Sequence, residues 1–268
     1  MTSSTSLPIA MRTRWLATAS RQSGLSLIEL MVGLAIGLLV VLAGTGSLLV
    51  TRQGSTTVSD SYRLTTEGNN AMRLIGSIVR QAGAAELAQA AVNTPVSFQN
   101  MTLRAFGPGG DQLVVGTDGG GAAPDQLVVY FQHRNDAVTR DCLGASPGAP
   151  GALTVNTFLV NGSELRCNGQ ALVGDNATPN AQPAVEDFQV WYWTLDAIGR
   201  QQRVTAADVP AAGGWPAVQA LEVCLQLRGI GVDYPRAGVY TNCQGNAVAH
   251  DGRLHQVFRN TYKLRNRM

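Results

Sequence analysis

The chain has 268 residues, of which 45% are hydrophobic and 14% charged, with 30 Gly and 11 Pro. This composition is typical of a folded globular protein with many turns and excludes an intrinsically disordered chain. The formal net charge is +2, but Arg12, Arg14 and Arg21 all lie within the first 24 residues, and without them 17 basic side chains face 18 acidic ones. The rest of the chain therefore has no global charge that would favour nucleic acid.

An apolar run of 26 residues extends from Leu25 to Val50 and contains one charge, Glu29. As a helix it would span about 39 Å, more than the roughly 30 Å of a hydrocarbon core. The segment before it is basic and has no acidic residue. This bias predicts a single membrane span with a cytoplasmic N-terminus and a periplasmic remainder.

Glu29 is unusual, because a carboxylate in an apolar span costs roughly 2.5–3.5 kcal/mol on insertion scales. A cut after Gly24 would free the α-amine of Leu25, which lies one helical turn from Glu29 and on the same face. Amine and carboxylate could then pair, within one chain or between neighbours. The alternative is an acidic residue in the first turn, favoured by the helix dipole.

The stretch Gly24-Leu25-Ser26-Leu27-Ile28-Glu29-Leu30-Met31 resembles the class III signal of type IV prepilins and type II secretion pseudopilins. In these families a membrane-bound prepilin peptidase cuts after the Gly and N-methylates the next residue. The resemblance implies a leader over residues 1–24, cleavage after Gly24, methylation of Leu25, and a role for Glu29 in registering each incoming subunit against its neighbour's amine. The families usually have Phe at the position of Leu25 and Thr at that of Ser26.

Two alternatives compete for this segment. A conventional secretory signal would have an apolar region of only 7–15 residues, and a plain membrane anchor would differ only in lacking the cut. Met11 is a second possible start that would shorten the leader.

Beyond Val50 the sequence is polar, but apolar residues recur at helical spacing. They are Val58, Tyr62, Met72, Ile75, Val79 and Ala82. We predict one helix from Leu25 to about Ala88, with residues 25–50 in the membrane or filament core and residues 51–90 as an amphipathic continuation. Gly33 and Gly37 have the small-xxx-small spacing of close helix pairs; the alternative is glycine tolerated in a lipid-facing helix.

Residues 91–268 form the predicted head, because the apolar period changes to two after Pro95 and turn residues multiply. The candidate strands are Leu113–Gly116, Leu127–Gln132, Thr157–Val160, Glu164–Cys167, Phe188–Thr194, Ala220–Arg228 and Leu254–Leu264. The predicted class is α+β, with a long helix packed on an antiparallel sheet. By the resemblance this is the ladle shape of pilins.

Later segments resemble the PilW-like minor pilins of type IV pili. They are Asn156–Val160, Glu164–Gly169, Val185–Val190 and Leu264–Arg267. The resemblance implies an inner-membrane protein that joins other minor pilins and the major pilin in a priming and tip complex, with a tip adhesin as a further candidate partner. A pseudopilin of a type II secretion tip complex and a membrane-anchored enzyme or adhesin without a filament are the alternatives.

Four cysteines, Cys142, Cys167, Cys224 and Cys243, follow the predicted span, where an oxidising compartment favours disulfides. Of three possible pairings, we favour Cys142 with Cys167 and Cys224 with Cys243, because each closes a short loop beside predicted strands. Zinc is disfavoured, since there is no C-x-x-C pair and only three His could help. No metal or cofactor is predicted.

Signals for catalysis are weak, and we predict no enzyme. Gly144-Ala145-Ser146-Pro147-Gly148 fits G-x-S-x-G, but its prolines prevent the helix that a nucleophile elbow needs, which predicts a loop. Two further features have alternative interpretations. Trp191-Tyr192-Trp193 could fill the core or form an exposed aromatic platform, and the basic final strand, with Arg253, Arg259, Lys263, Arg265 and Arg267, could be an edge contact or a solvated face.

Overall fold

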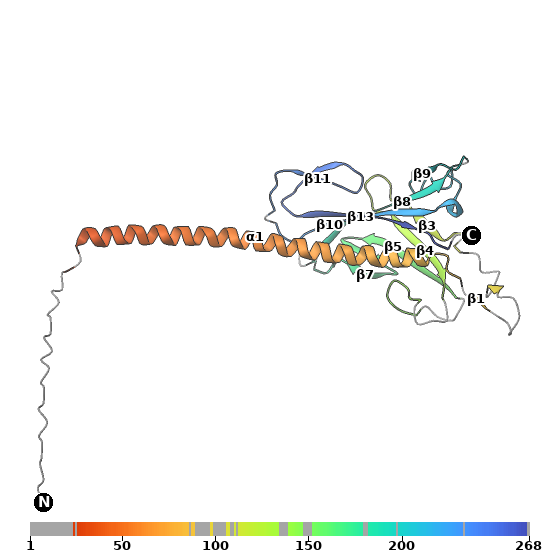
Figure 1. Cartoon of the computed structure of the whole chain (residues 1–268), viewed down its shortest axis with the longest axis horizontal. Coiled ribbons are helices and arrows are strands. Elements are labelled where there is room, and N and C mark those ends of the chain that lie inside the picture. Colours follow the sequence, from red (N-terminus) through yellow and green to blue (C-terminus); the bar gives the residue numbers. More distant parts are fainter. Residues whose placement is uncertain are drawn as a thin grey trace, which may run out of the picture. The chain divides into compact units, whose positions relative to one another are not determined.

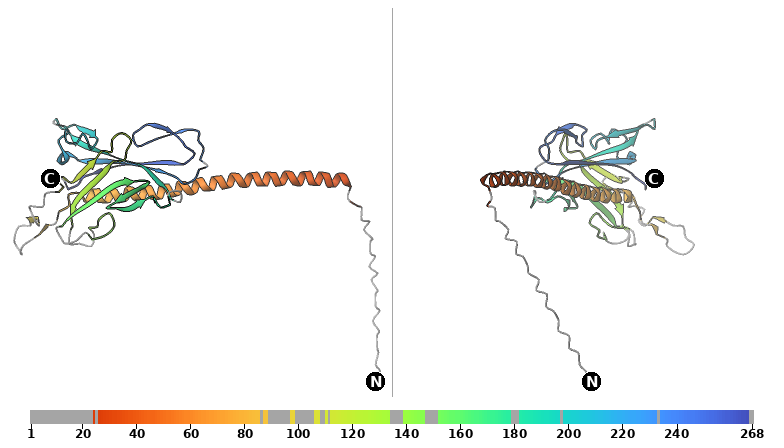
Figure 2. Two further views of the ribbon diagram at one scale, coloured as in Figure 1. Left: turned by 180° about the vertical axis from the view of Figure 1, so that it is seen from behind. Right: turned by 60° about the vertical axis from the view of Figure 1, so that its left-hand side comes forward.

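The protein is described by a computed structural model that covers residue 24 and residues 26–85, 87–88, 97–98, 106–107, 110, 112–133, 139–146, 152–178, 182–196, 198–232 and 234–266. Its chain divides into two compact units, Met1–Thr51 and Arg52–Met268. Figures 1 and 2 show one long helix, to which both units contribute, and the strands of the second unit. The predicted α+β class, a long N-terminal helix followed by an antiparallel β head, is confirmed.

Helix α1 runs from Leu27 to Gln81, and both of its ends differ from the prediction. It starts after Ser26, whose carbonyl accepts the N–H groups of Glu29 and Leu30 at 3.0 and 3.2 Å. It ends seven residues before Ala88, because Gly83 has a φ of +71° and its N–H donates to the carbonyl of Tyr130 instead of continuing the helix. Leu87–Ala88 then forms the short strand β1, which pairs with β2 (Ser97–Phe98).

The second unit contains two larger antiparallel sheets. The five-stranded sheet has the order β3 (Val114–Thr117), β4 (Gln126–Gln132), β5 (Leu153–Asn161), β6 (Glu164–Cys167), β7 (Gln170–Val173). The four-stranded sheet has the order β13 (His255–Lys263), β10 (Ala220–Arg228), β8 (Ala184–Leu195), β9 (Gln201–Val204). A separate hairpin joins β11 (Val239–Thr241) to β12 (Ala247–Ala249), and a 3-10 turn, η2, spans Trp215–Ala217.

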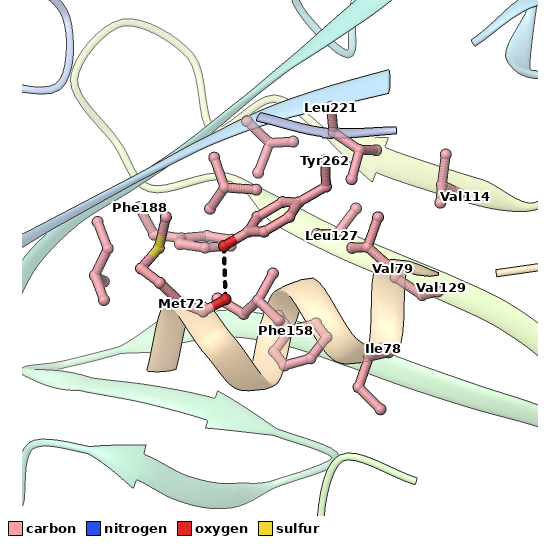
Figure 3. Packing of buried hydrophobic residues seen from close by; sticks show 14 of the residues in the cluster. Met72, Ile78, Val79, Val114, Leu127, Val129, Phe158, Phe188, Leu221 and Tyr262 are labelled. Carbon is pink, nitrogen blue, oxygen red and sulfur yellow. Dashed lines mark hydrogen bonds between the residues drawn. The ribbon is translucent and has the colours of Figure 1, made fainter. Parts of the chain in front are cut away.

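The second half of α1 packs against side chains from both sheets. Figure 3 shows Met72, Ile78 and Val79 of α1 beside core residues of β3, β4, β5, β8, β10 and β13. The predicted stripe holds from Met72 onward, but Tyr62 is 72% exposed and Val58 70% exposed. At 3.6 residues per turn, Tyr62 lies about 140° around the helix from the buried Ile75, whereas Leu64 lies about 20° from it, so Leu64 is the first apolar residue of the buried face.

Strand β8 places its side chains alternately on two faces. Phe188, Val190 and Tyr192 enter the core, whereas Trp191 and Trp193 lie on the other face and are partly exposed. The prediction that the aromatic triplet helps to fill the core is therefore correct for Tyr192. The two tryptophans belong to the outer face of the four-stranded sheet.

Candidate functional site

The residues that the sequence marks for processing and assembly lie at the start of α1. Gly24 is exposed and precedes the helix, Leu25 lies outside the described residues, and Ser26 occupies the N-cap position. Glu29 is in the first turn and its side chain is exposed. A carboxylate there is favoured by the helix dipole, so the position of Glu29 agrees with the first-turn alternative.

The apolar span Leu27–Leu48 has 22 residues and a mean hydropathy of 2.5, and none of it is buried within the chain. At 1.5 Å per residue it is about 33 Å long, which is enough to cross a hydrocarbon core. Its large side chains, from Leu27 to Leu48, are 52–77% exposed. This surface needs an apolar environment from outside the chain, either lipid or neighbouring helices.

Glycines and hydroxyl groups inside the span also suit an apolar environment. A Cβ atom at Gly33 or Gly37 would meet nothing within 4 Å. At these two positions the helix backbone is not covered by a side chain, so another helix could approach it closely. The hydroxyl of Thr45 donates to the carbonyls of Val41 and Leu42, each at 3.0 Å, and Ser47 bonds to the carbonyl of Gly44 at 3.0 Å. The polar groups are thus satisfied within the helix, which stays continuous through Gly44-Thr45-Gly46.

The structure joins Cys142 to Cys167 and Cys224 to Cys243, the pairing favoured from the sequence. The first bridge ties the loop at residues 139–146 to β6. The second ties β10 to the turn between β11 and β12. All four sulfurs are buried with their residues, which are at most 3% exposed.

The G-x-S-x-G segment is a loop where it is described, as predicted. The structure nevertheless brings the Ser146 hydroxyl within 3.3 Å of His133 Nε2, a contact that no sequence pattern indicates. The other imidazole nitrogen of His133 is buried and has no hydrogen-bond partner among the residues that the structure describes. A nucleophile–base–carboxylate chain is therefore not assembled among the described residues.

The two other histidines lie in a different part of the head. His255 bonds to Glu186 at 2.8 Å through Nδ1 and to Asp251 at 3.0 Å through Nε2, and its ring stacks on Tyr240 with centroids 4.4 Å apart. His250 packs at the edge of the same cluster. Within the part of the chain that the structure describes, no three His, Cys, Asp or Glu side chains are arranged to hold a metal.

Comparison with known proteins supports the N-terminal assignment. Residues 19–45 match the family model described as the prokaryotic N-terminal methylation motif. A type IV-like pilin from Thermus thermophilus is similar in structure at 17% identity, with 77% of this chain and 99% of that chain covered and a TM-score of 0.45. No curated protein sequence matched. The chain thus carries the methylation motif of prepilins at the residues that begin α1.

Proposed function

We propose that the chain is a subunit of a type IV pilus, cut after Gly24, N-methylated at Leu25 and assembled into a filament through the first half of α1. The observation that carries the proposal is the methylation motif at residues 19–45, which coincides with an apolar span that the described residues leave unburied. The role is structural: the helix supplies the assembly surface and the β-rich head is displayed outside the membrane.

In this scheme the same span serves two environments in turn. Before assembly it lies in the inner membrane, with the basic leader in the cytoplasm and the head in the periplasm. In the filament, neighbouring helices replace lipid around its apolar side chains, and Gly33 and Gly37 allow a close approach. Glu29 then pairs with the terminal amine of a neighbouring subunit, which offsets the cost of a carboxylate in an apolar environment.

The more specific part of the proposal is a minor pilin of the PilW-like kind. It is supported by the similarity of head segments such as Glu164–Gly169 and Val185–Val190 to that family. As such, the protein would join other minor pilins in a complex that primes growth and caps the pilus tip, with the major pilin below it.

Processing is tested by mass spectrometry of the protein extracted from membranes of a cell that has a prepilin peptidase. We expect a mature N-terminus of N-methyl-Leu25. Intact leader would leave a plain anchor, and an N-terminus well inside the apolar span would mean conventional signal cleavage; either result contradicts the proposal.

Assembly is tested with Glu29→Ala and Glu29→Gln. Both variants remove the charge, so membrane insertion should be equal to or better than that of the wild type, whereas surface pili should be lost or strongly reduced. The membrane fraction is measured in parallel to show that each variant is inserted and processed. Wild-type piliation by both variants, or crosslinks to type II secretion subunits instead of pilins, would show that the proposal is wrong.

A further inference from the structure

The outer face of the four-stranded sheet, opposite the core, carries a groove of about 500 Å³. It crosses all four strands of the sheet near the ends of β8 and β13. The groove is lined by Trp193, Gln201, Gln219, Ala220, Thr261, Lys263 and Leu264. Its floor is apolar and aromatic, whereas its rim consists of amide, hydroxyl and ammonium groups.

The polar side chains of this groove form no ion pair or hydrogen bond with the described residues. Lys263, the one lysine of the chain, makes no ion pair with any described residue. Within the same described ranges, the side chains of Gln201, Gln219 and Thr261 form no hydrogen bond, and the buried indole N–H of Trp193 has no partner. The Trp193 N–H is enclosed by the chain, so the polar groups that are open to a ligand here are the exposed side chains of Gln201, Thr261 and Lys263.

In a neighbouring groove on the same face, by contrast, the charged side chains already have partners. It has a volume of about 540 Å³ and includes Trp191, Arg203 and Arg259. Both guanidinium groups bond to Glu222, and their Cζ atoms lie 3.9 and 5.0 Å from the centroid of the Trp191 ring. Both guanidinium groups there share the carboxylate of Glu222, and the indole is already in contact with these cations, so Trp191 does not form the free aromatic platform considered from the sequence.

The groove with Lys263 also lies beside a free sheet edge. Strand β13 is an edge strand, and among the described strands it pairs with β10 alone. The N–H of Leu264 donates to the carbonyl of Gln219 at 2.9 Å, so Leu264 faces the sheet. Hydrogen bonding alternates along an antiparallel strand, so the main-chain groups of Thr261 and Lys263 point away from β10. The N–H of Thr261 is met only by the side chain of the adjacent Asn260, at 2.9 Å.

We propose that the free edge of β13, beside this groove, binds an extended segment of a partner polypeptide that carries a carboxylate. The segment adds to the free edge of β13 at Thr261 and Lys263, and its carboxylate pairs with the Lys263 ammonium. A polypeptide fits better than an anionic glycan because only a main chain can use the hydrogen-bonding groups of the strand edge. The proposal concerns the head alone and does not depend on filament assembly.

The test uses the full chain in detergent and synthetic eight-residue peptides of alternating Thr and Val with one central Asp, followed by fluorescence anisotropy. A charge-assisted hydrogen bond to Lys263 should make the Asp peptide bind about tenfold or more tightly than the same peptide with Asn. Lys263→Gln should abolish that preference. Arg73→Gln, which removes an equal charge from the exposed face of α1, should retain it.

A second arm tests the strand edge. Methylation of alternate backbone nitrogens of the peptide should abolish binding in one of the two alternating sets and leave the other set close to the parent. Equal affinity of the Asp and Asn peptides, no effect of Lys263→Gln, or no effect of methylation in either set would overturn the proposal. So would binding of an anionic oligosaccharide in preference to every peptide.

Discussion

The phenol hydroxyl of Tyr262, in the last strand of the head, donates a hydrogen bond to the main-chain carbonyl of Met72, in the second half of α1, at 2.6 Å. Figure 3 shows this bond inside the apolar cluster where α1 meets the sheets. Both groups are buried, and 190 positions of sequence separate them. The bond therefore fixes the position of β13 along α1 and also the distance between β13 and α1.

Tyr262→Phe should lower the free energy of unfolding by about 1 kcal/mol, the usual net value of one buried hydrogen bond. The loss stays small because the Met72 carbonyl has a second lone pair and keeps its bond within the helix. Chemical denaturation of the detergent-solubilised chain, followed by tryptophan fluorescence, measures it. Tyr62→Phe is the matched control, because Tyr62 is 72% exposed and should tolerate the same change. If Tyr62→Phe lowered the free energy of unfolding by as much as Tyr262→Phe, the loss could not be attributed to the hydrogen bond of Tyr262.

Gly76→Ala should destabilise the head although alanine is the better helix former. A Cβ atom at Gly76 would lie 2.4 Å from Cε1 of Tyr262, and such overpacking costs about 1–3 kcal/mol, more than the ~1 kcal/mol gained in helix propensity.

Gly54→Ala provides the comparison on the same helix. Nothing lies within 4 Å of a Cβ atom there, so the substitution should stabilise α1 by up to about 1 kcal/mol. The same denaturation experiment measures both variants. Stabilisation by both substitutions would mean that α1 and β13 do not pack as closely as described.

The main elements could be predicted because their signals are local. Helical spacing from Met72 to Ala82 and a period of two in the strands come directly from the side chains that the core buries. The turn at Asn161-Gly162-Ser163 is equally local, because Asn-Gly favours a tight hairpin turn, and Gly162 has a φ of +62° between β5 and β6.

What escaped prediction depends on contacts between distant residues. The alanine-rich stretch after Gln81 has good helix propensity, so its strand β1 could not be foreseen. Short polar strands such as β9 and β11 carry no strong periodicity. Glycine inside a helix ordinarily only weakens it, yet a Cβ atom at Gly68 would lie 2.2 Å from Cε2 of Phe258, so glycine is needed there for the packing of β13.

Loss of the Cys224–Cys243 bridge should loosen the β11–β12 hairpin in particular. This hairpin forms no ladder with either large sheet, and the bridge closes a loop of 19 residues, worth about 3 kcal/mol in the chain-entropy model. In a Cys224→Ala/Cys243→Ala variant, amide hydrogen exchange should accelerate across Val239–Ala249. The Cys142→Ala/Cys167→Ala variant serves as the control and should leave exchange in this hairpin unchanged. Equal acceleration in both variants would point to general unfolding instead.

The last prediction concerns the pH dependence of the outer face of the four-stranded sheet. Burial alone would raise the pKa of Glu222, but hydrogen bonds from Arg203 and Arg259 hold that pKa below its ordinary value of 4.5. The Arg203 bonds are 3.0 Å long and the Arg259 bond 2.6 Å, and the Glu222 side chain is 13% exposed. Because the pKa is lower in the folded than in the unfolded state, the carboxylate stabilises the fold above about pH 4.5, and this contribution is lost as the pH falls through the folded pKa.

Glu222→Gln should therefore cost about 1–2 kcal/mol at pH 7, where two arginines lose their counter-charge, and the difference from the wild type should shrink as the pH falls below about 4.5. Denaturation curves of both proteins between pH 7 and pH 3 measure this difference. Asp196→Asn is a suitable comparison, since the pKa of Asp196 is also lowered, mainly by the Arg200 N–H, but the group lies in an exposed turn. Its effect should be much smaller at every pH, because solvent screens that interaction. A difference between wild type and Glu222→Gln that stayed constant down to pH 3 would show that the carboxylate contributes through packing and not through its charge.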